Sequence, residues 1–272
     1  MTRPTVGILG VGSMGEIFAL GLLRAGWEPS DIRLAVRRPE RARELEFTTG
    51  SATTFSLSEA AVDREVLIVA VKPKDVQTVL REIADVVTLD QVVVSIAAGV
   101  PVAVFENALP DVPVVRSMPN TPSAVDLGIT AFTIGSAVGE EQSDRAQAVL
   151  GAVGQTLEVS EDLLDAVTAV SGTGPAYVFL MAEALIEAAI REGLPHHAAE
   201  KLVHQTMRGA GELLLTSDKS AFRLRGEVTS PGGTTAAAMH VLEDGGFRAL
   251  IENAVRSAAE RSRELGERAS DQ

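Results

Sequence analysis

Six residues near the start of the sequence, Gly10-Val11-Gly12-Ser13-Met14-Gly15, constrain the fold more than any other feature. They follow a short apolar run, Thr5–Gly10, and precede a helical apolar pattern that ends at Gly26. A glycine-rich turn between a strand and a helix is where doubly wound sheets bind the pyrophosphate of a dinucleotide. The motif therefore predicts a parallel sheet with a dinucleotide cofactor at its first turn.

Each glycine of this motif has its own expected role. Gly10 allows the tight turn, Gly12 leaves room for the pyrophosphate, and Gly15 lets the helix and the strand pack closely. Ser13 and Met14 belong to the same motif and are also expected to contact the cofactor, while the positive N-terminus of the following helix faces the phosphates. A purely structural turn would have similar composition, but the position between strand and helix favours cofactor binding.

Apolar runs at regular intervals extend this strand–helix pattern into a sheet. We predict further strands at Ile32–Val36, Val66–Val71, Val92–Ile96 and Val114–Met118, alternating with helical segments such as Arg38–Glu46. Strands that alternate with helices form parallel crossovers. The fold class is therefore α/β, and the first domain, residues 1–158, is expected to be a Rossmann-like, dinucleotide-binding doubly wound sheet.

The pattern changes after about Glu158, where no convincing strand follows. Long Ala-rich segments with helical spacing predict helices at Pro175–Glu192, His197–Leu215, a short stretch after Pro231, and Phe247–Leu265. We expect residues 159–272 to form a second, all-helical domain. The helix Pro175–Glu192 is apolar around most of its circumference, which predicts that it is buried, partly by a partner subunit. A homodimer, which could be built into a larger ring, is the expected assembly.

Two arginines, Arg37 and Arg38, stand at the end of the second predicted strand. An NAD enzyme usually places a carboxylate there to hold the ribose 2′-hydroxyl, whereas a guanidinium can pair with a 2′-phosphate. The sequence therefore favours NADPH over NADH. The alternative is that the two arginines are simply the solvated start of a helix.

Charge and composition limit the partners. The 37 acidic and 24 basic residues give a net charge of −13, which disfavours nucleic acid and anionic lipid. With no cysteine, disulfides, thiolate nucleophiles and Cys-based metal sites are excluded, and we expect no metal site. No export signal or long aliphatic run is recognisable, so we expect a cytoplasmic protein without membrane contact that acts on a small molecule.

Several longer strings narrow the function further. They are Val71–Pro73, Ser95–Val100, Arg116–Pro122, Ser171–Tyr177 and Val228–Thr235. In their order and spacing they resemble the pyrroline-5-carboxylate reductases over nearly the whole chain. The resemblance implies NADPH-dependent reduction of the cyclic imine L-1-pyrroline-5-carboxylate to L-proline. It also implies that Val71, Lys72, Pro73 and Ala97 line the nicotinamide side of the cofactor.

The same resemblance implies a substrate loop at Ser230, Gly232, Gly233, Thr234 and Thr235. The hydroxyl of Thr235, the expected catalytic group, would hydrogen-bond the ring nitrogen. Backbone N–H groups at a helix N-terminus suit a carboxylate, so the assignment makes physical sense. An ordinary capped helix start would have a similar sequence.

Two segments depart from the family pattern. Relatives often have an asparagine near the adenosine, but Thr48–Ser58 offers only Ser and Thr, so the adenosine contacts stay open. Relatives also carry a glutamate and a His-Pro turn where this chain has Thr216–Phe222. Asp218 could replace that glutamate in substrate binding, or it could be an N-cap or the solvated end of a loop.

Other functions on the same two-domain plan remain as alternatives. Another imine reductase is one, and a β-hydroxyacid dehydrogenase is a second, although such enzymes commonly use a lysine that Pro175–Glu192 lacks. A non-catalytic NADP-binding regulator is a third. Hydride transfer to an imine depends mainly on positioning, so no acid–base cluster is needed. The four histidines, at 196, 197, 204 and 240, are accordingly expected to be structural or on helix surfaces.

Overall fold

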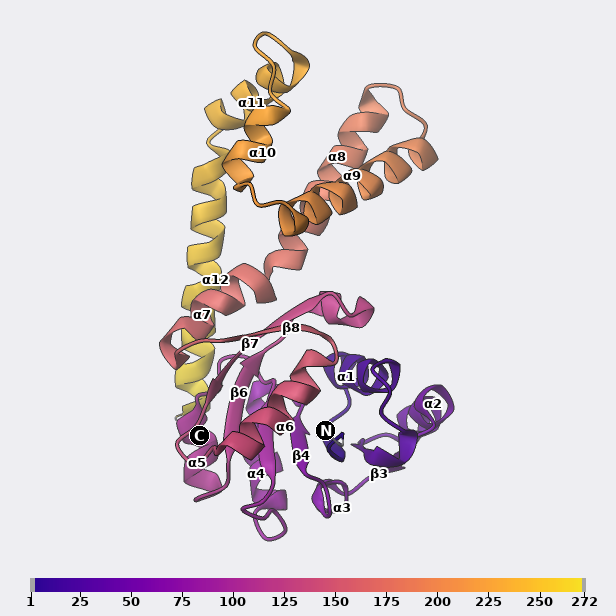
Figure 1. Ribbon diagram of the computed structural model, residues 1–272, viewed down its shortest axis with the longest axis vertical. Coiled ribbons are helices and arrows are strands. Elements are labelled where there is room, and N and C mark those ends of the chain that lie inside the picture. The colour runs from indigo at the N-terminus through magenta and orange to yellow at the C-terminus, as the bar shows by residue number, and fades with distance from the viewer. Residues whose placement is uncertain (1–2, 271–272) are drawn as a thin grey trace. The chain divides into compact units, whose positions relative to one another are not determined.

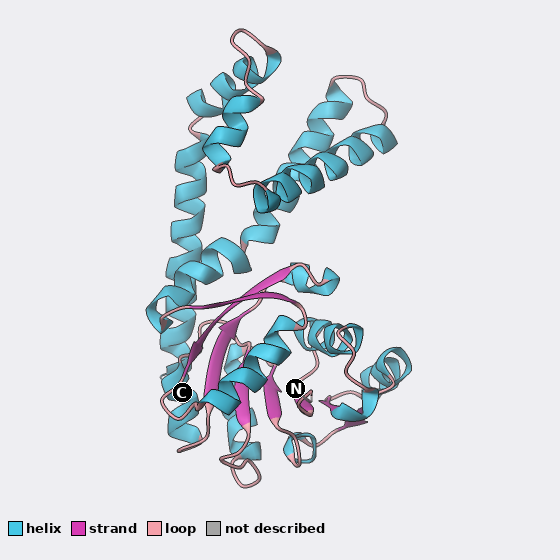
Figure 2. Ribbon diagram, in the orientation of Figure 1, coloured by secondary structure: helices cyan, strands magenta, loops and turns pink. Residues whose placement is uncertain are grey.

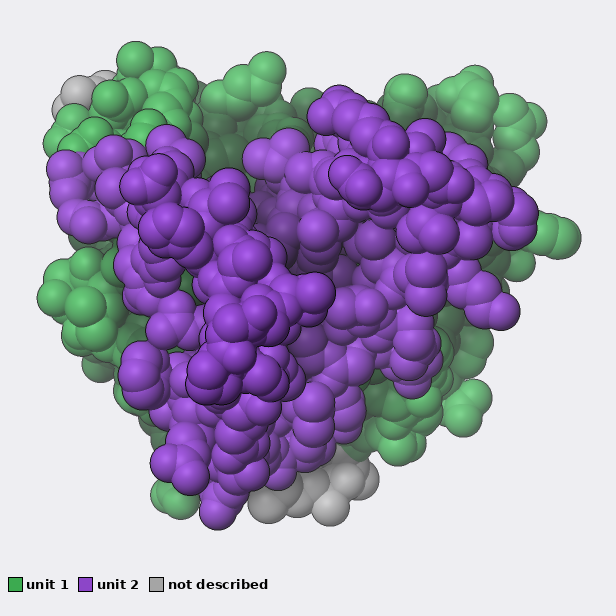
Figure 3. Space-filling view, turned by 90° about the horizontal axis from the view of Figure 1, so that it is seen from above, with its two compact units in different colours: residues 1–173, 257–272 green, residues 174–256 purple. Residues whose placement is uncertain are grey.

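The chain divides into two compact units, which Figure 3 shows in two colours. The computed structural model describes residues 3–270. One unit consists of residues 1–173 and 257–272, and the other is Gly174–Arg256. This division differs from the expected boundary after residue 158. The reason is that α7 (Leu164–Val167) packs against the sheet and that a late segment of the chain rejoins the first unit.

The first unit is built on one mixed sheet in the order β3-β2-β1-β4-β5-β6-β7-β8. Neighbouring strands are parallel except for the antiparallel pair β6 and β7. The five expected strands all form, which confirms the doubly wound sheet, whereas β3, β7 and β8 were not expected. The strands are β1 (Val6–Leu9), β2 (Ile32–Ala35), β3 (Ala52–Thr54), β4 (Val66–Val69), β5 (Val92–Ser95), β6 (Val114–Met118), β7 (Gly128–Ile134) and β8 (Gly154–Glu158).

Helices cover both faces of this sheet (Figure 2). Because side chains alternate along a strand, Val66 and Ile68 of β4 belong to one hydrophobic core and Leu67 and Val69 to the other. The first core includes α1 (Ser13–Arg24), α2 (Pro39–Thr49) and α6 (Glu140–Gly151). The second includes α3 (Leu57–Ala61), α4 (Val76–Ile83) and α5 (Val102–Ala108). The central strands are therefore buried on both faces, as their unbroken Val/Ile runs indicate.

The second unit is all-helical, as expected. It contains α8 (Gly174–Arg191), α9 (His196–Thr216), α10 (Ala221–Glu227), α11 (Thr234–Asp244) and the first part of α12 (Phe247–Ser270). Helices α8 and α9 pack side by side after a turn at Gly193 (Figure 1). The expected helices form within a few residues of their expected bounds, and α10 is an addition.

Helix α8 is not buried within the single chain, which corrects one expectation. None of its residues is buried, and Phe179 and Leu180 are about two-thirds exposed, at 66% and 65%. Within the unit α8 packs against α9, and much of its apolar surface remains exposed in the single chain. By length and composition alone, the helical stretch Glu161–Arg191 could also cross a membrane, the one such stretch within residues 3–270.

Candidate functional site

A cleft of about 560 Å³ opens at the carboxyl ends of the central strands in the first unit. It lies where β1 has β2 on one side and β4 on the other, the point at which the strand order reverses and ligands of such sheets bind. Its walls come from residues 10–14, 36–38 with 41, 70–73 with 75, 96–98, and 118–119. Residues 10–14 of the fingerprint, both arginines and the expected nicotinamide-side residues Val71, Lys72, Pro73 and Ala97 thus line one cleft, whereas Gly15 lies outside its lining.

The glycine turn has the geometry that close approach of a ligand requires. Gly10 has a φ of +88°, and a side chain there would overlap Val71, so only glycine fits. A Cβ on Gly15 would lie 3.2 Å from the Gly10 carbonyl oxygen, which keeps α1 close to β1. At Gly12, by contrast, a Cβ would meet no protein atom within 4 Å. The space above Gly12, at the N-terminus of α1, is therefore free for a phosphate.

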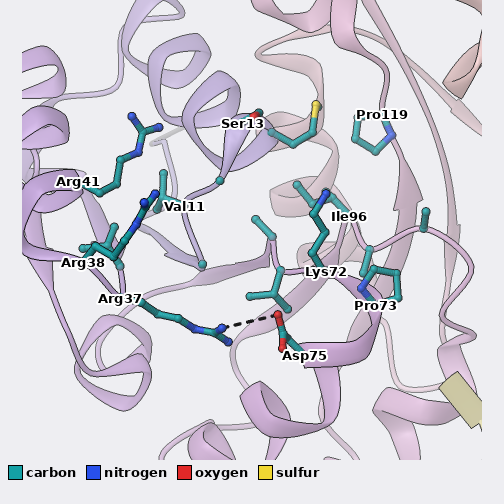
Figure 4. Close-up of a pocket in the computed structure, with 18 of the residues that line it drawn as sticks. Val11, Ser13, Arg37, Arg38, Arg41, Lys72, Pro73, Asp75, Ile96 and Pro119 are labelled. Atoms are coloured by element: carbon teal, nitrogen blue, oxygen red, sulfur yellow. Dashed lines mark ion pairs between the residues drawn. The ribbon is translucent and has the colours of Figure 1, made fainter.

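Three guanidinium groups gather on one side of the cleft (Figure 4). Arg41 donates to Glu16 at 2.5 Å and pairs with Glu44 at 2.8 Å, and these two hydrogen bonds raise the pKa of Arg41 above its usual value. Arg37 faces Asp75 at 3.7 Å. Arg38, the N-cap of α2, forms no ion pair within residues 3–270, so its charge is available to an anion.

The opposite wall is less charged and follows β4 and β5. Lys72, Pro73 and Ile96 lie there, across the cleft from the arginines (Figure 4). A tight turn fixes the first two, because the Asp75 N–H donates to the Lys72 carbonyl oxygen at 2.9 Å. After β5, the Ala97 N–H donates to the Ser95 hydroxyl at 3.3 Å. This wall provides a largely apolar surface for a flat ring.

Sequence reasoning missed several of the lining residues. Arg41 had a usable signal, because it lies three positions after Arg38 at the start of a helix and therefore on the same side. Ile96 and Ala98 flank the expected Ala97, and Met118 and Pro119 belong to one of the quoted strings. The ion pair between Arg37 and Asp75 joins separate elements, β2's end and the turn after β4, and no sequence signal indicates it.

The expected substrate loop lies in the second unit, at the start of α11. The Gly233 N–H donates to the Ser230 carbonyl oxygen at 3.0 Å, and Gly232, with a φ of +69°, makes the turn possible. Gly233 is the N-cap, and the first helical hydrogen bond runs from the Ala237 N–H to the Gly233 carbonyl oxygen. The N–H groups of the first three helical residues, among them Thr234 and Thr235, consequently have no acceptor within the helix.

Other residues singled out in the sequence lie outside these two places. Asp218 is exposed in the loop between α9 and α10, and the N-cap of α10 is Ser220, so Asp218 is not an N-cap. Residues 48–58 do not line the described cleft. The four histidines are exposed on α9 and α11, as expected. No group of metal-ligating side chains was found within residues 3–270.

Comparisons with known proteins agree over nearly the whole chain. The family described as pyrroline-5-carboxylate reductase dimerisation matches residues 161–265, and NADP oxidoreductase, coenzyme F420-dependent, matches residues 5–99. The pyrroline-5-carboxylate reductase of Mycobacterium tuberculosis is 42% identical, with 96% of each chain covered. A solved structure of this enzyme from Coxiella burnetii superposes with a TM-score of 0.90 at 36% identity, covering 97% of this chain and 99% of that one. The Plasmodium falciparum enzyme with NADP bound gives 0.89 at 29% identity, covering 98% and 99%.

Proposed function

The chain belongs to the pyrroline-5-carboxylate reductase family, and from this membership we propose which of its residues bind the cofactor and the substrate. It is an oxidoreductase that reduces L-1-pyrroline-5-carboxylate to L-proline with NADPH, by hydride transfer to the cyclic imine. The observation that carries this function is 42% identity to a pyrroline-5-carboxylate reductase over 96% of both chains. For function, we assign residues 1–158 to cofactor binding and 159–272 to substrate binding and dimerisation.

The cleft of the first unit fits NADP. A dinucleotide needs a close backbone approach for its pyrophosphate, and the open space above Gly12 at the N-terminus of α1 meets that need. We assign Gly10, Gly12, Ser13, Met14 and Gly15 to this part of the cofactor. The amide dipoles of α1 would stabilise the two phosphate charges.

The arginine side of the cleft fits the 2′-phosphate that distinguishes NADP from NAD. We assign Arg38 as its main partner, because Arg41 is held by two carboxylates and Arg37 by one. A guanidinium without a protein partner can give both of its parallel N–H donors to phosphate oxygens. Arg37 contributes a second, weaker contact, since Asp75 competes for it.

The opposite wall fits the nicotinamide. Val71, Lys72, Pro73 and Ala97 provide the contact surface, with Ile96 beside them. The tight turn at Lys72 and the hydrogen bond between Ala97 and Ser95 fix this surface before a ligand arrives. A rigid wall favours catalysis because reaction rate depends strongly on how well two reacting atoms are aligned.

The loop at the start of α11 fits the substrate's carboxylate and ring nitrogen. We propose that Ser230, Gly232 and Gly233 shape a turn whose N–H groups, with those of Thr234 and Thr235, bind the carboxylate. Within residues 3–270 the hydroxyls of Thr234 and Thr235 form no hydrogen bond, so both remain available. We assign Thr235 to the ring nitrogen. Asp218 is exposed near the end of α9, and we propose that it influences substrate binding by its charge alone.

The chemistry asks little of the protein itself. Bound NADPH supplies the hydride, and the protonated imine is already an electrophile. Ala97 and Pro73 give the nicotinamide an apolar contact surface on the wall of the cleft. The Thr235 hydroxyl accepts a hydrogen bond from the ring N–H, which keeps the proton on that nitrogen. No acid–base pair is required of the protein.

The helical part is an oligomerisation domain, matched over residues 161–265 by the dimerisation family. We propose a homodimer as its basic assembly, with a ring of dimers as the larger form, and cytoplasmic localisation without membrane or nucleic-acid contact. The apolar, exposed surface of α8 supports the dimer, because a patch of Phe179, Leu180 and their neighbours would otherwise face water. Sedimentation at micromolar concentration tests this, and a monomer would contradict it.

One assay tests the function. The rate of NADPH oxidation is measured with pyrroline-5-carboxylate, with piperideine carboxylate and with a set of β-hydroxyacids and NADP⁺. We expect turnover with the first substrate at the highest kcat/KM and none with the hydroxyacids. Absence of turnover with pyrroline-5-carboxylate by a folded, cofactor-binding protein would leave a non-catalytic NADP-binding role instead.

A further inference from the structure

The loop that follows β5, residues 96–101, has two sides with different neighbours. Ile96, Ala97 and Ala98 line the cofactor cleft. Gly99 and Pro101 instead line a separate cavity of about 540 Å³, together with residues of α7 and α12. One loop therefore contributes to both the cofactor cleft and this second cavity.

That support is a contact between two glycine backbones. A Cβ on Gly266 of α12 would lie 2.5 Å from the Gly99 carbonyl oxygen, closer than real Cβ atoms approach a backbone atom. Gly99 has a φ of +79°, and a Cβ there would lie 3.1 Å from the Ser262 carbonyl oxygen and 3.2 Å from the Gly266 nitrogen. Helix α12 thus rests directly on the loop, with no side chain between them.

Both contacting segments are anchored. The Ser262 hydroxyl, on a residue that is 3% exposed, donates to Asp165 Oδ1 of α7 at 2.6 Å, which fixes the end of α12 in the first unit. The far end of the loop is held at Val102, whose N–H donates to Glu161 Oε1 at 2.8 Å. Arg116, a buried residue, donates to the same Glu161 oxygen at 2.8 Å. The loop is therefore held by a hydrogen bond at its end and contacted by α12 in its middle.

We propose that Gly266 is a positioning residue for the reduction: by packing on Gly99, it sets the position of the cleft wall at Ala97 and Ala98, and with it the alignment of the nicotinamide. This inference rests on the proposed role of Ala97. A methyl group at position 266 must move α12 or the loop, because the atom it meets is a backbone oxygen that cannot swing aside. Loop movement by ~1 Å can cost up to ~10²-fold in rate.

The test compares Gly266→Ala with Gly151→Ala, a matched change at the end of α6 where a Cβ meets no atom within 4 Å. For each full-length protein we would measure kcat, the KM for NADPH, the thermal midpoint, and the Ki of adenosine 2′,5′-bisphosphate, which occupies only the adenosine side. We expect Gly266→Ala to lower kcat by about tenfold and to raise the KM for NADPH, with the Ki within about twofold of wild type. Gly151→Ala should match wild type throughout.

Two results would overturn the proposal. One is a folded Gly266→Ala enzyme with wild-type kcat and KM, and the other is a Ki that worsens in parallel with kcat, which indicates general distortion. If Gly266→Ala does not fold, Ser262→Ala decides, because it loosens the anchor at Asp165 without adding an atom. It should lower kcat by about threefold with the Ki unchanged, and wild-type kinetics would refute the idea. Wild-type protein that fails to reduce the imine would instead refute the proposed function.

Discussion

Replacing Arg38 with alanine should separate the two nicotinamide cofactors. Arg38 stands at the edge of the cleft without an ion pair in residues 3–270, so its full interaction is available to the 2′-phosphate. A hydrogen bond to a charged group contributes about 1.5–3 kcal/mol. Since about 1.36 kcal/mol corresponds to tenfold, we expect Arg38→Ala to raise the KM for NADPH by about 10- to 100-fold. The KM for NADH, which lacks the phosphate, should change by less than about twofold.

The neighbouring Arg37 provides the comparison. Its side chain is 69% exposed and already faces Asp75, so Arg37→Ala should raise the KM for NADPH by only about threefold. Initial rates with each cofactor at saturating imine measure both effects. Raising the ionic strength should weaken NADPH binding in the wild type and much less in Arg38→Ala. Equal losses for NADPH and NADH, or a larger effect at Arg37 than at Arg38, would refute this reasoning.

Three further predictions follow from the site and its support. Gly12→Val should leave the thermal midpoint within a few degrees of wild type, because its Cβ enters open space, but should raise the Kd for NADPH by at least about tenfold. A variant that binds NADPH normally would contradict the assignment of the pyrophosphate to the space above Gly12. Thr235→Val should lower kcat and kcat/KM together by about one to two orders of magnitude, with Thr234→Val as the control; the reverse result would shift the assignment by one residue. Glu161→Gln should destabilise the protein by about 1–3 kcal/mol in urea unfolding, since Glu161 is the one carboxylate paired with the buried Arg116 guanidinium within residues 3–270; an unchanged midpoint would contradict that.

The strands that sequence predicts well are those buried on both faces. Two examples are Val66–Val69 and Val92–Ser95, whose residues are all buried. Because both faces of such a strand are covered, its sequence is a nearly unbroken aliphatic run, and composition alone identifies it. Strand β8 is mostly exposed, and its sequence, Gly-Gln-Thr-Leu-Glu, has no strong apolar signal. Strand β3 is three residues long, too short for a period to be read. Edge strands of this kind depend on their neighbours rather than on their own residues.

Much of the lining of the cleft could be predicted because the residues concerned lie directly after strands. Fingerprint, arginines and Val71–Pro73 all follow strand ends, and parallel strands bring such positions to one edge. Contacts between residues far apart in the sequence could not be predicted in this way. The contact between Gly99 and Gly266 joins residues in a loop and a helix, and neither carries a side chain that could mark it. Likewise the apolar sequence of α8 predicts burial, but a single sequence does not identify what covers this helix.

The first unit can be completed only late in synthesis, because its last part, residues 257–272, follows the whole second unit in the chain. Residues 174–256, which belong to the second unit, separate the two parts of the first. A ribosome adding about 5–20 residues per second needs roughly 4 to 17 seconds to make these 83 residues. Throughout that interval the nascent chain lacks Gly266, so the backbone at Gly99 is without the helix that contacts it in the complete protein. A fragment made of residues 1–173 alone would remain in that incomplete state after release.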